Sequence, residues 1–142
     1  MNNRIILLLI LIVLTFLSSG CEGFIPGEDE LTGTKWRLID WSDNSLDPLQ
    51  FTITANFDDL CISGNSAVNY YSGLYFANDN PLFSVRELQV TLMGGSEEAM
   101  QAESTYLKLL EQANKFTVKQ NALTLFDEAN KELLLFSKIG ID

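Results

Sequence analysis

Apolar and polar residues alternate along most of the chain beyond residue 30, a pattern typical of β-strands that bury one face. The clearest alternation runs through residues 49–57 (LQFTITANF), where every odd position is apolar and every even position is polar. Residues 83–93 (FSVRELQVTLM) carry apolar side chains on both faces, as expected of a strand inside a small barrel or beneath a helix. The same reasoning predicts shorter strands at residues 35–40, 60–63, 70–77, 115–119, 122–126 and 131–136.

One segment has helical spacing instead. Gly94 and Gly95 end the preceding strand, and Ser96 is a typical N-cap residue. We therefore predict a helix from residue 97 to about residue 113, whose first turn carries two glutamates that the helix dipole stabilises. Its expected buried stripe consists of Ala99, Met100, Glu103, Tyr106, Leu107, Leu110 and Ala113.

Together, about seven short strands and one helix predict a mostly β (α+β) fold. The expected architecture is a closed or nearly closed antiparallel sheet with the helix covering one end. Residues 31–142 contain no internal repeat, low-complexity tract or second linker, so we expect them to fold as one domain.

The first 21 residues have the pattern of a secretory signal. Arg4 precedes an apolar run at residues 5–17 that only one threonine interrupts, and small residues follow before Cys21. Thirteen helical residues span about 20 Å, which is short of the ~30 Å hydrocarbon core of a bilayer. We expect a cleaved signal peptide over residues 1–20, and an uncleaved anchor is the alternative.

Residues 18–20 (Ser-Ser-Gly) and Cys21 resemble the lipobox of prokaryotic lipoproteins, in which the cysteine thiol is acylated and the chain is cut just before it. The lipobox normally has leucine three residues before the cysteine, where this chain has Ser18. The resemblance implies acyl chains such as palmitate on Cys21, which would hold the domain outside the cytoplasm at the cell membrane or envelope. Residues 21–30 are rich in glycine, proline and acidic side chains, which predicts a flexible tether.

Charge and composition narrow the possible functions. The chain has nine Lys and Arg, nineteen Asp and Glu and no His, for a net charge of −10. Binding of nucleic acid depends on Lys and Arg side chains that neutralise phosphates, and this chain has too few of them. We therefore exclude nucleic acid as a partner. The absence of His removes the usual general base and the commonest metal ligand, and two cysteines are too few for a thiolate zinc site. We therefore expect no enzyme activity, no metal and no cofactor.

Three local groups could suggest chemistry. Asp58 and Asp59 are adjacent at a strand end, so their side chains point to opposite faces and indicate a turn rather than a catalytic pair. Cys61 is expected to be a small buried side chain, and no His is present to activate it as a nucleophile. One loop could hold Ca²⁺ but lacks the spacing of an EF-hand, and its oxygen-bearing residues are Asp40, Asp43, Asn44 and Asp47.

Glu103 is unusual because it lies within the apolar stripe of the predicted helix. A carboxylate in such a place needs hydrogen-bond donors, since burying it without them is costly. We expect the Thr91 hydroxyl or the Asn69 amide to bind it, with Arg86 as the nearest candidate for a charged donor. The alternative is a solvated position at the edge of the stripe.

Five segments carry a family resemblance: LTGTKWRL, SGNSAVNYYSGLY, TLM, AESTYLKLL and NALTLFDEANKELLLF. Within residues 31–136 they resemble the META domain, as in the HslJ family of bacterial envelope lipoproteins. The positions that carry this resemblance are Gly64, Asn69, Tyr71, Gly73, Tyr75, Thr91, Met93 and Glu103.

The resemblance also points to what the chain lacks. The family's Gly-Cys pair corresponds to Ala67 and Val68, and its second cysteine corresponds to Gly95. In many members these two cysteines are thought to pair, so the resemblance implies that this chain has lost a disulfide. Cys61 is then left without a partner, because Cys21 is expected to carry lipid.

The resemblance implies a cracked, lipocalin-like barrel with one helix and no known catalytic site, in a family linked to heat-shock response, drug tolerance and virulence. We expect a non-catalytic, membrane-anchored lipoprotein that serves as an interaction or stress-tolerance module for an envelope protein or peptide. The alternatives are a carrier of a small apolar molecule and, third, a secretion-pilot-like assembly factor. A carrier needs an internal cavity, whereas an interaction module has its interior filled by side chains such as Phe51, Ile53, Val90 and Leu110.

Overall fold

The computed structural model describes residues 30–43, 45–78 and 81–140. Within these ranges eight antiparallel strands form one sheet, in the order β5-β4-β3-β2-β1-β8-β7-β6. One α-helix, α2 (Glu97–Gln112), and one short 3-10 helix, η1 (Pro48–Gln50), accompany the sheet in the same residues. The strands are β1 (Lys35–Trp41), β2 (Thr54–Asp58), β3 (Cys61–Asn65), β4 (Tyr70–Ala77), β5 (Phe83–Val90), β6 (Lys115–Lys119), β7 (Ala122–Phe126) and β8 (Glu132–Lys138).

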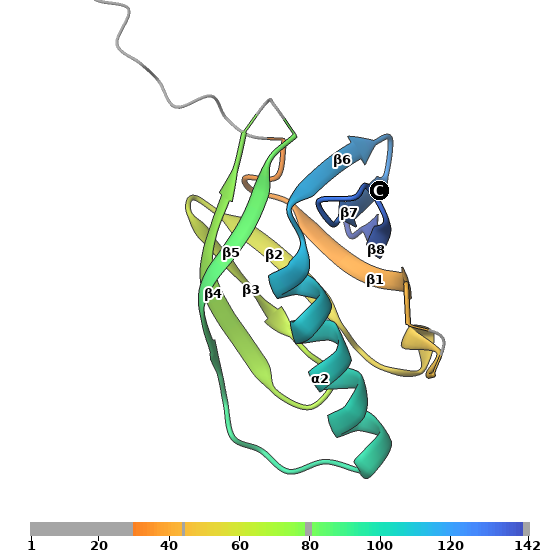
Figure 1. Ribbon diagram of the computed structural model, residues 1–142. Helices are drawn as coiled ribbons and strands as arrows, with labels where there is room; N and C mark the ends of the chain where they lie inside the picture. Colours follow the sequence, from red (N-terminus) through yellow and green to blue (C-terminus); the bar gives the residue numbers. More distant parts are fainter. Residues whose placement is uncertain (1–29, 44, 79–80, 141–142) are drawn as a thin grey trace, which may run out of the picture.

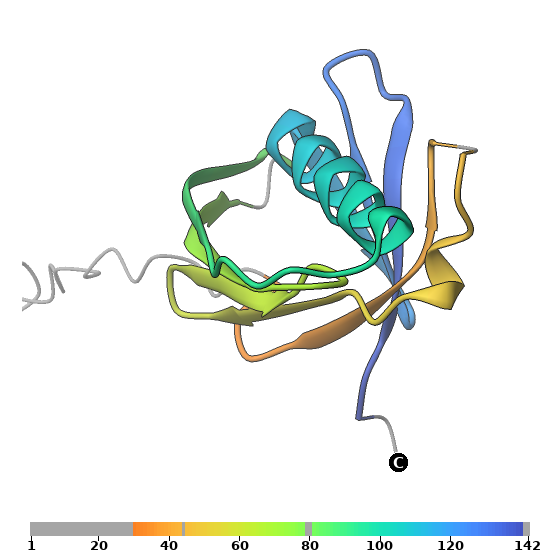
Figure 2. The same cartoon turned by 90° about the horizontal axis from the view of Figure 1, so that it is seen from below.

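The sheet curls into a half-barrel, and α2 lies in its opening between β5 and the strands β6 to β8 (Figures 1 and 2). The edge strands β5 and β6 approach each other at one end. There the Phe83 amide donates to the Asn114 carbonyl at 2.8 Å. The Phe116 amide likewise donates to the Pro81 carbonyl at 2.9 Å. Because the helix covers the rest of the opening, the predicted mostly β fold, a nearly closed barrel with one helix, is confirmed.

The core lies between the concave face of the sheet and α2. Trp36, Phe136 and Tyr106 are among its largest fully buried side chains. Aromatic rings meet edge to face through this core, for example Phe57 with Tyr75 at a centroid distance of 4.9 Å. The helix contributes the buried residues Ala102, Tyr106, Leu109 and Leu110.

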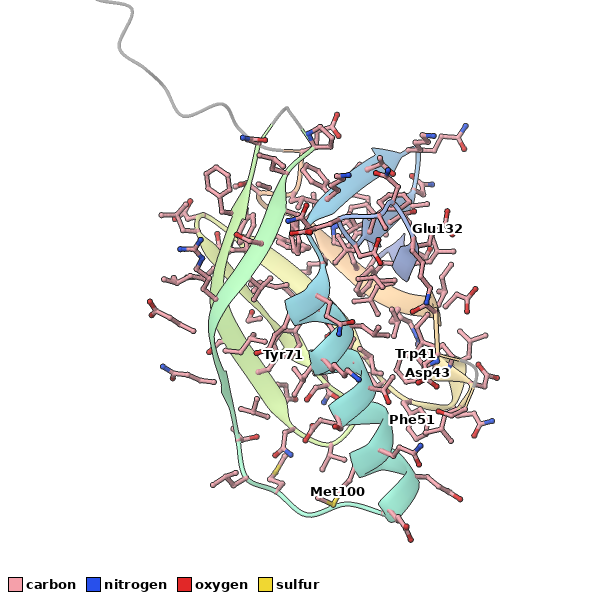
Figure 3. All side chains as sticks on the ribbon, viewed as in Figure 1. Trp41, Asp43, Phe51, Tyr71, Met100 and Glu132 are labelled. Atoms are coloured by element: carbon pink, nitrogen blue, oxygen red, sulfur yellow. The ribbon has the colours of Figure 1, made fainter. Side chains whose placement is uncertain are left out.

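The buried face of α2 differs from the predicted stripe. Met100 is half exposed, whereas Ala102 and Leu109, which the stripe left out, are buried. Met100 belongs to the first turns of the helix, near the loop that enters it (Figure 3). The buried face is turned toward Ala102 and Leu109, so that Glu103 lies at its edge rather than at its centre.

The strand predicted over residues 49–57 is shorter in the structure. Residues 48–50 form η1, and Leu49 is 55% exposed. The Asp47 carboxylate accepts a hydrogen bond from the Leu49 amide at 2.9 Å, and Pro48 favours the first position of a helical turn. These two residues start a helical turn where the alternation predicted a strand. The inward positions from Ile53 onward are buried as predicted.

The mixed faces of residues 83–93 have a physical cause. Glu87 has a φ of 56° and lies at an irregularity in the pairing of β4 with β5. Such a bulge adds one residue to the strand and moves the following side chains to the other face. Phe83 and Val85 therefore face the core before the bulge, and Leu88 and Val90 pack against it afterwards.

Candidate functional site

The segment that joins β3 to β4 has an irregular backbone held by its own polar groups. The Ser66 amide donates to the Asn69 carbonyl at 2.8 Å, and the Asn65 side chain accepts from the Ala67 amide at 2.9 Å. Ala67 has a φ of 96°, a conformation that favours glycine. The family resemblance places glycine at this position, and the strained backbone provides the physical reason.

Asn69 connects this segment to the loop before α2. Its side chain is almost fully buried, and its Oδ1 accepts from the Met93 amide at 2.7 Å and from the Thr91 hydroxyl at 2.8 Å. Its Nδ2 donates to the Met93 carbonyl at 3.2 Å and to Glu103 Oε1 at 2.9 Å. The Asn69 side chain therefore connects the segment between β3 and β4, the loop before α2 and α2 itself.

The Glu103 carboxylate is bound by neutral donors. Its Oε2 accepts from the Ser66 hydroxyl at 2.6 Å and from the backbone amide of Asn69 at 2.8 Å. The hydrogen-bonded role predicted for Glu103, with the Asn69 side chain as a donor, is confirmed, whereas the Thr91 hydroxyl binds Asn69 instead. Among the described residues, Arg86 makes no ion pair with it. Sequence reasoning missed Ser66, because no local pattern relates it to Glu103, 37 positions away.

These contacts set the ionisation of Glu103. Partial burial acts to raise the pKa of its carboxyl, but the hydrogen bonds from Ser66, Asn69 and the Val68 backbone outweigh this effect. The pKa is therefore lowered, and the carboxylate is charged at neutral pH. A carboxylate that is charged at neutral pH and held by neutral donors anchors the helix, and it is a poor candidate for a proton-transfer group.

A second buried contact lies deeper in the core. The Tyr71 hydroxyl donates to the Thr54 carbonyl at 2.9 Å and lies 2.6 Å from the Tyr106 hydroxyl. Since the carbonyl can only accept, Tyr106 must donate to Tyr71. Burial raises the pKa of both hydroxyls above their ordinary value, so neither ionises at neutral pH. The pair fastens α2 to the sheet.

Two motif glycines allow the backbone to approach closely. A Cβ on Gly64 would lie 2.0 Å from the Thr54 carbonyl oxygen, the atom to which Tyr71 donates. A Cβ on Gly73 would lie 2.9 Å from the Arg86 carbonyl oxygen, beside the bulge of β5. Each position excludes a side chain for a steric reason.

The remaining motif residue, Tyr75, lies at the other end of β4. Its hydroxyl is 3.0 Å from the Thr32 hydroxyl, and its ring is buried. The motif residues other than glycine thus have three roles. Asn69, Thr91, Met93 and Glu103 build the hydrogen-bond network at the edge of the helix. Tyr71 joins the sheet to α2, and Tyr75 ties β4 to the segment before β1.

Val68 and Gly95, which correspond to the family's two cysteines, are in contact. A Cβ on Gly95 would lie 3.5 Å from the Val68 Cβ and 2.7 Å from its Cγ2. A distance of 3.5 Å between two Cβ atoms suits a disulfide. The valine side chain occupies the space where the resemblance implies a bridge in other members.

The other candidate groups have local structural roles. Asp58 is the last residue of β2 and pairs with Cys61, so the predicted turn begins one residue later, at Asp59, which has a φ of 46°. The prediction that Cys61 is buried is wrong, because it is exposed and free. The alternation of β3 places Ile62 and Gly64 inside, so its first residue faces outward.

In the possible calcium loop, the described acidic side chains each bind a neighbouring residue and do not converge on one point. Asp40 accepts from the Trp41 amide, Asp43 binds Ser45 and Asp47 caps η1, whereas Asn44 lies outside the described residues. Within the described ranges, no three His, Cys, Asp or Glu side chains are grouped so that they could hold a metal ion.

The predicted lipidation site, Cys21, also lies outside the described residues, together with the predicted signal peptide and most of the tether. Among residues 30–140 that the structure describes, the helices are too short or too polar to cross a bilayer.

Comparison with known proteins bears on the family. The family model described as the META domain matches residues 29–139. The chain belongs to the META domain family. The match includes the motif positions described above, from Gly64 to Glu103. No protein with a curated description matches the META domain chain significantly.

Two solved structures are similar in fold. The NMR structure of a protein from Burkholderia xenovorans has a TM-score of 0.65 and 23% identity, over 78% of this chain and 85% of that one. The crystal structure of a DUF4847 family protein from Bacteroides vulgatus has a TM-score of 0.61 and 14% identity, over 81% of this chain and 99% of that one. At these identities the similarity concerns the fold of the META domain.

Proposed function

We propose that this META domain protein is a non-catalytic, lipid-anchored module of the cell envelope that acts through its outer surface. The filled interior is the observation that carries the proposal. Ile53 and Leu110 are fully buried between sheet and helix, and Phe51 and Val90 pack against the same core. An interior occupied by its own side chains leaves little room for a bound apolar molecule.

The outer surface offers contacts instead. Leu60 and Leu74 are exposed apolar side chains at one end of β3 and β4. Leu92 is fully exposed in the loop before α2, and Met93 beside it is half exposed. Exposed apolar groups of this kind support binding to an envelope protein or peptide. Assembly of another envelope component, the secretion-pilot-like role, would use the same surface.

Acyl labelling tests the anchor. In cells fed a labelled fatty acid, the wild-type chain should become labelled and Cys21→Ala should not. Cys61→Ala is the matched control, because it removes the other cysteine and should leave the label unchanged. Equal labelling of wild type and Cys21→Ala would contradict the lipid anchor.

A fluorescent apolar probe distinguishes a surface module from a carrier. We expect N-phenyl-1-naphthylamine to show no saturable binding to the purified protein, because the helix and the core fill the barrel. Saturable binding that Leu110→Trp abolishes would favour the carrier, since the added ring would block a cavity beneath α2.

A further inference from the structure

The register of the sheet places a row of uncharged polar side chains across the outer face of four strands. Asn56 pairs with Ser63, Ser63 with Ser72, and Ser72 with Gln89. Three strand spacings of about 4.8 Å make this row about 14 Å long. Lys35 pairs with Asn56 and adds a cation beyond one end of the row. The row is thus longer than one sugar ring and uncharged along its length.

These four side chains are available to a ligand. Ser72 and Gln89 are exposed and Asn56 and Ser63 are half-buried. In the described part of the chain, none of the four side chains takes part in a hydrogen bond. Hydroxyls and carboxamides both donate and accept, which is the pattern that sugar hydroxyls require of their partners.

The surface is hollowed at this row. A hollow of about 540 Å³ is lined by residues of β2 to β5 and their ends: Thr54, Asn56, Ser63, Gly64, Asn65, Tyr70, Tyr71, Ser72, Gln89, Val90 and Thr91. None of these lining residues is charged, although one residue in five of the whole chain is. A site for an anion or a metal ion would need charged groups.

An aromatic ring stands beside the row. Tyr70 is 64% exposed and belongs to β4, two residues before Ser72 on the same face. Its backbone is fixed, because its amide donates to the Thr91 hydroxyl at 3.2 Å and its carbonyl accepts from the Thr91 amide at 3.0 Å. An exposed ring on a fixed strand provides a flat apolar face beside polar groups.

The floor of the hollow is held from beneath. Tyr71 donates to the Thr54 carbonyl, and Gly64 leaves the space that this carbonyl occupies. Tyr106 of α2 donates to Tyr71 from the core side, as derived above. A ligand would therefore meet a surface that needs little ordering on binding.

We propose that this hollow binds an uncharged oligosaccharide of two or more sugar units, with the row of amides and hydroxyls bonding to the sugar hydroxyls and Tyr70 stacking on a sugar face. The proposal goes beyond the proposed function, because the exposed apolar side chains are assigned to a protein or peptide partner and this hollow to a separate ligand.

Calorimetric titration of the full-length protein tests the site. The detergent should be lauryldimethylamine oxide, which has no sugar headgroup. The neutral probes are maltotriose, cellotriose and the β-1,4-linked trimer of N-acetylglucosamine, and trigalacturonate is the anionic comparison. At least one neutral trisaccharide should bind saturably. Tyr70→Ala and Gln89→Ala should each weaken that binding by about ten-fold or more.

Two exposed residues away from the hollow provide matched controls. Phe76→Ala removes an aromatic ring from the same strand, and Gln101→Ala removes an amide from α2. Both should bind as the wild type does, and all four variants should melt at the wild-type temperature because they alter exposed side chains.

Three results would overturn the proposal: no binding of any neutral trisaccharide at millimolar concentration, equal loss with the Phe76→Ala control, or binding of trigalacturonate alone. The last result would assign the affinity to Lys35 rather than to the uncharged row. None of them would alter the acyl labelling or the apolar-probe result, so the proposed function can fail or hold separately.

Discussion

Introducing cysteines in place of Val68 and Gly95 should create a stabilising disulfide. The Cβ atoms at these positions are 3.5 Å apart, within the range that disulfides adopt. The double variant should be made in residues 30–142 with Cys61→Ser, so that the two new thiols are the only ones present.

The expected stabilisation follows from the loop that the bridge would close. A cross-link between positions 68 and 95 restrains about 28 residues of the unfolded chain, which corresponds to about 3.5 kcal/mol at 25 °C. Replacing Val68 also removes the Cγ2 that lies 2.7 Å from the added Cβ. Gly95→Cys alone keeps that clash and should therefore destabilise the fold.

Urea unfolding with and without reductant measures the effect. The oxidised double variant should unfold at a clearly higher urea concentration than its reduced form, whereas reductant should not change the unfolding of the unsubstituted segment. If the thiols do not pair, or if pairing adds less than about 1 kcal/mol, Val68 and Gly95 are not neighbours as described. The reasoning about the lost bridge would then be wrong.

Three further predictions concern the network at the helix edge. Glu103→Ala should lower the free energy of unfolding by about 1 to 2 kcal/mol, because it leaves the Ser66 and Asn69 donors without their acceptor at a partly hydrated site. A change below about 0.5 kcal/mol, measured by urea unfolding, would contradict the anchor role. Because the pKa of Glu103 is lowered in the folded state, its contribution to stability should be present above its ordinary pKa of 4.5 and lost as pH falls through the folded pKa. The free energy of unfolding, measured from pH 6 to pH 3, should therefore fall less steeply in Glu103→Gln than in wild type. Ala67→Gly should stabilise the domain by about 1 kcal/mol, because glycine adopts a φ of 96° without strain. A lower melting temperature in Ala67→Gly than in wild type would contradict the strain at Ala67.

Local patterns predicted most of the fold. β4, β6 and β7 begin and end at the predicted residues, because β6 and β7 are short alternating runs next to turn residues and β4 is an aromatic, extended run that ends at a loop. The start of α2 at Glu97 also agreed, since Ser96 caps it through the Ala99 amide. At Asp47 and Pro48 the capping carboxylate and the proline favoured a helical turn, and the structure has η1 there instead of the strand that alternation predicted.

The site was less predictable, because its contacts join distant parts of the chain. A carboxylate on an apolar stripe indicated that Glu103 needs donors, and Asn69 was identified as one of them. Ser66 could not be found, because its distance from Glu103 depends on how β3 and α2 pack together. The contact between Tyr71 and Tyr106 has the same origin, since nothing within either segment indicates the other.

The pairing of β1 with β8 has a consequence for how the chain folds. These strands lie side by side within the sheet, with Trp36 opposite Lys138, although about one hundred residues separate them. The first strand can therefore complete its pairing only after the last strand has been synthesised, and a high contact order of this kind slows folding. Removing the last dozen residues would not trim an edge, because it would divide the sheet between β1 and β7 and expose the core.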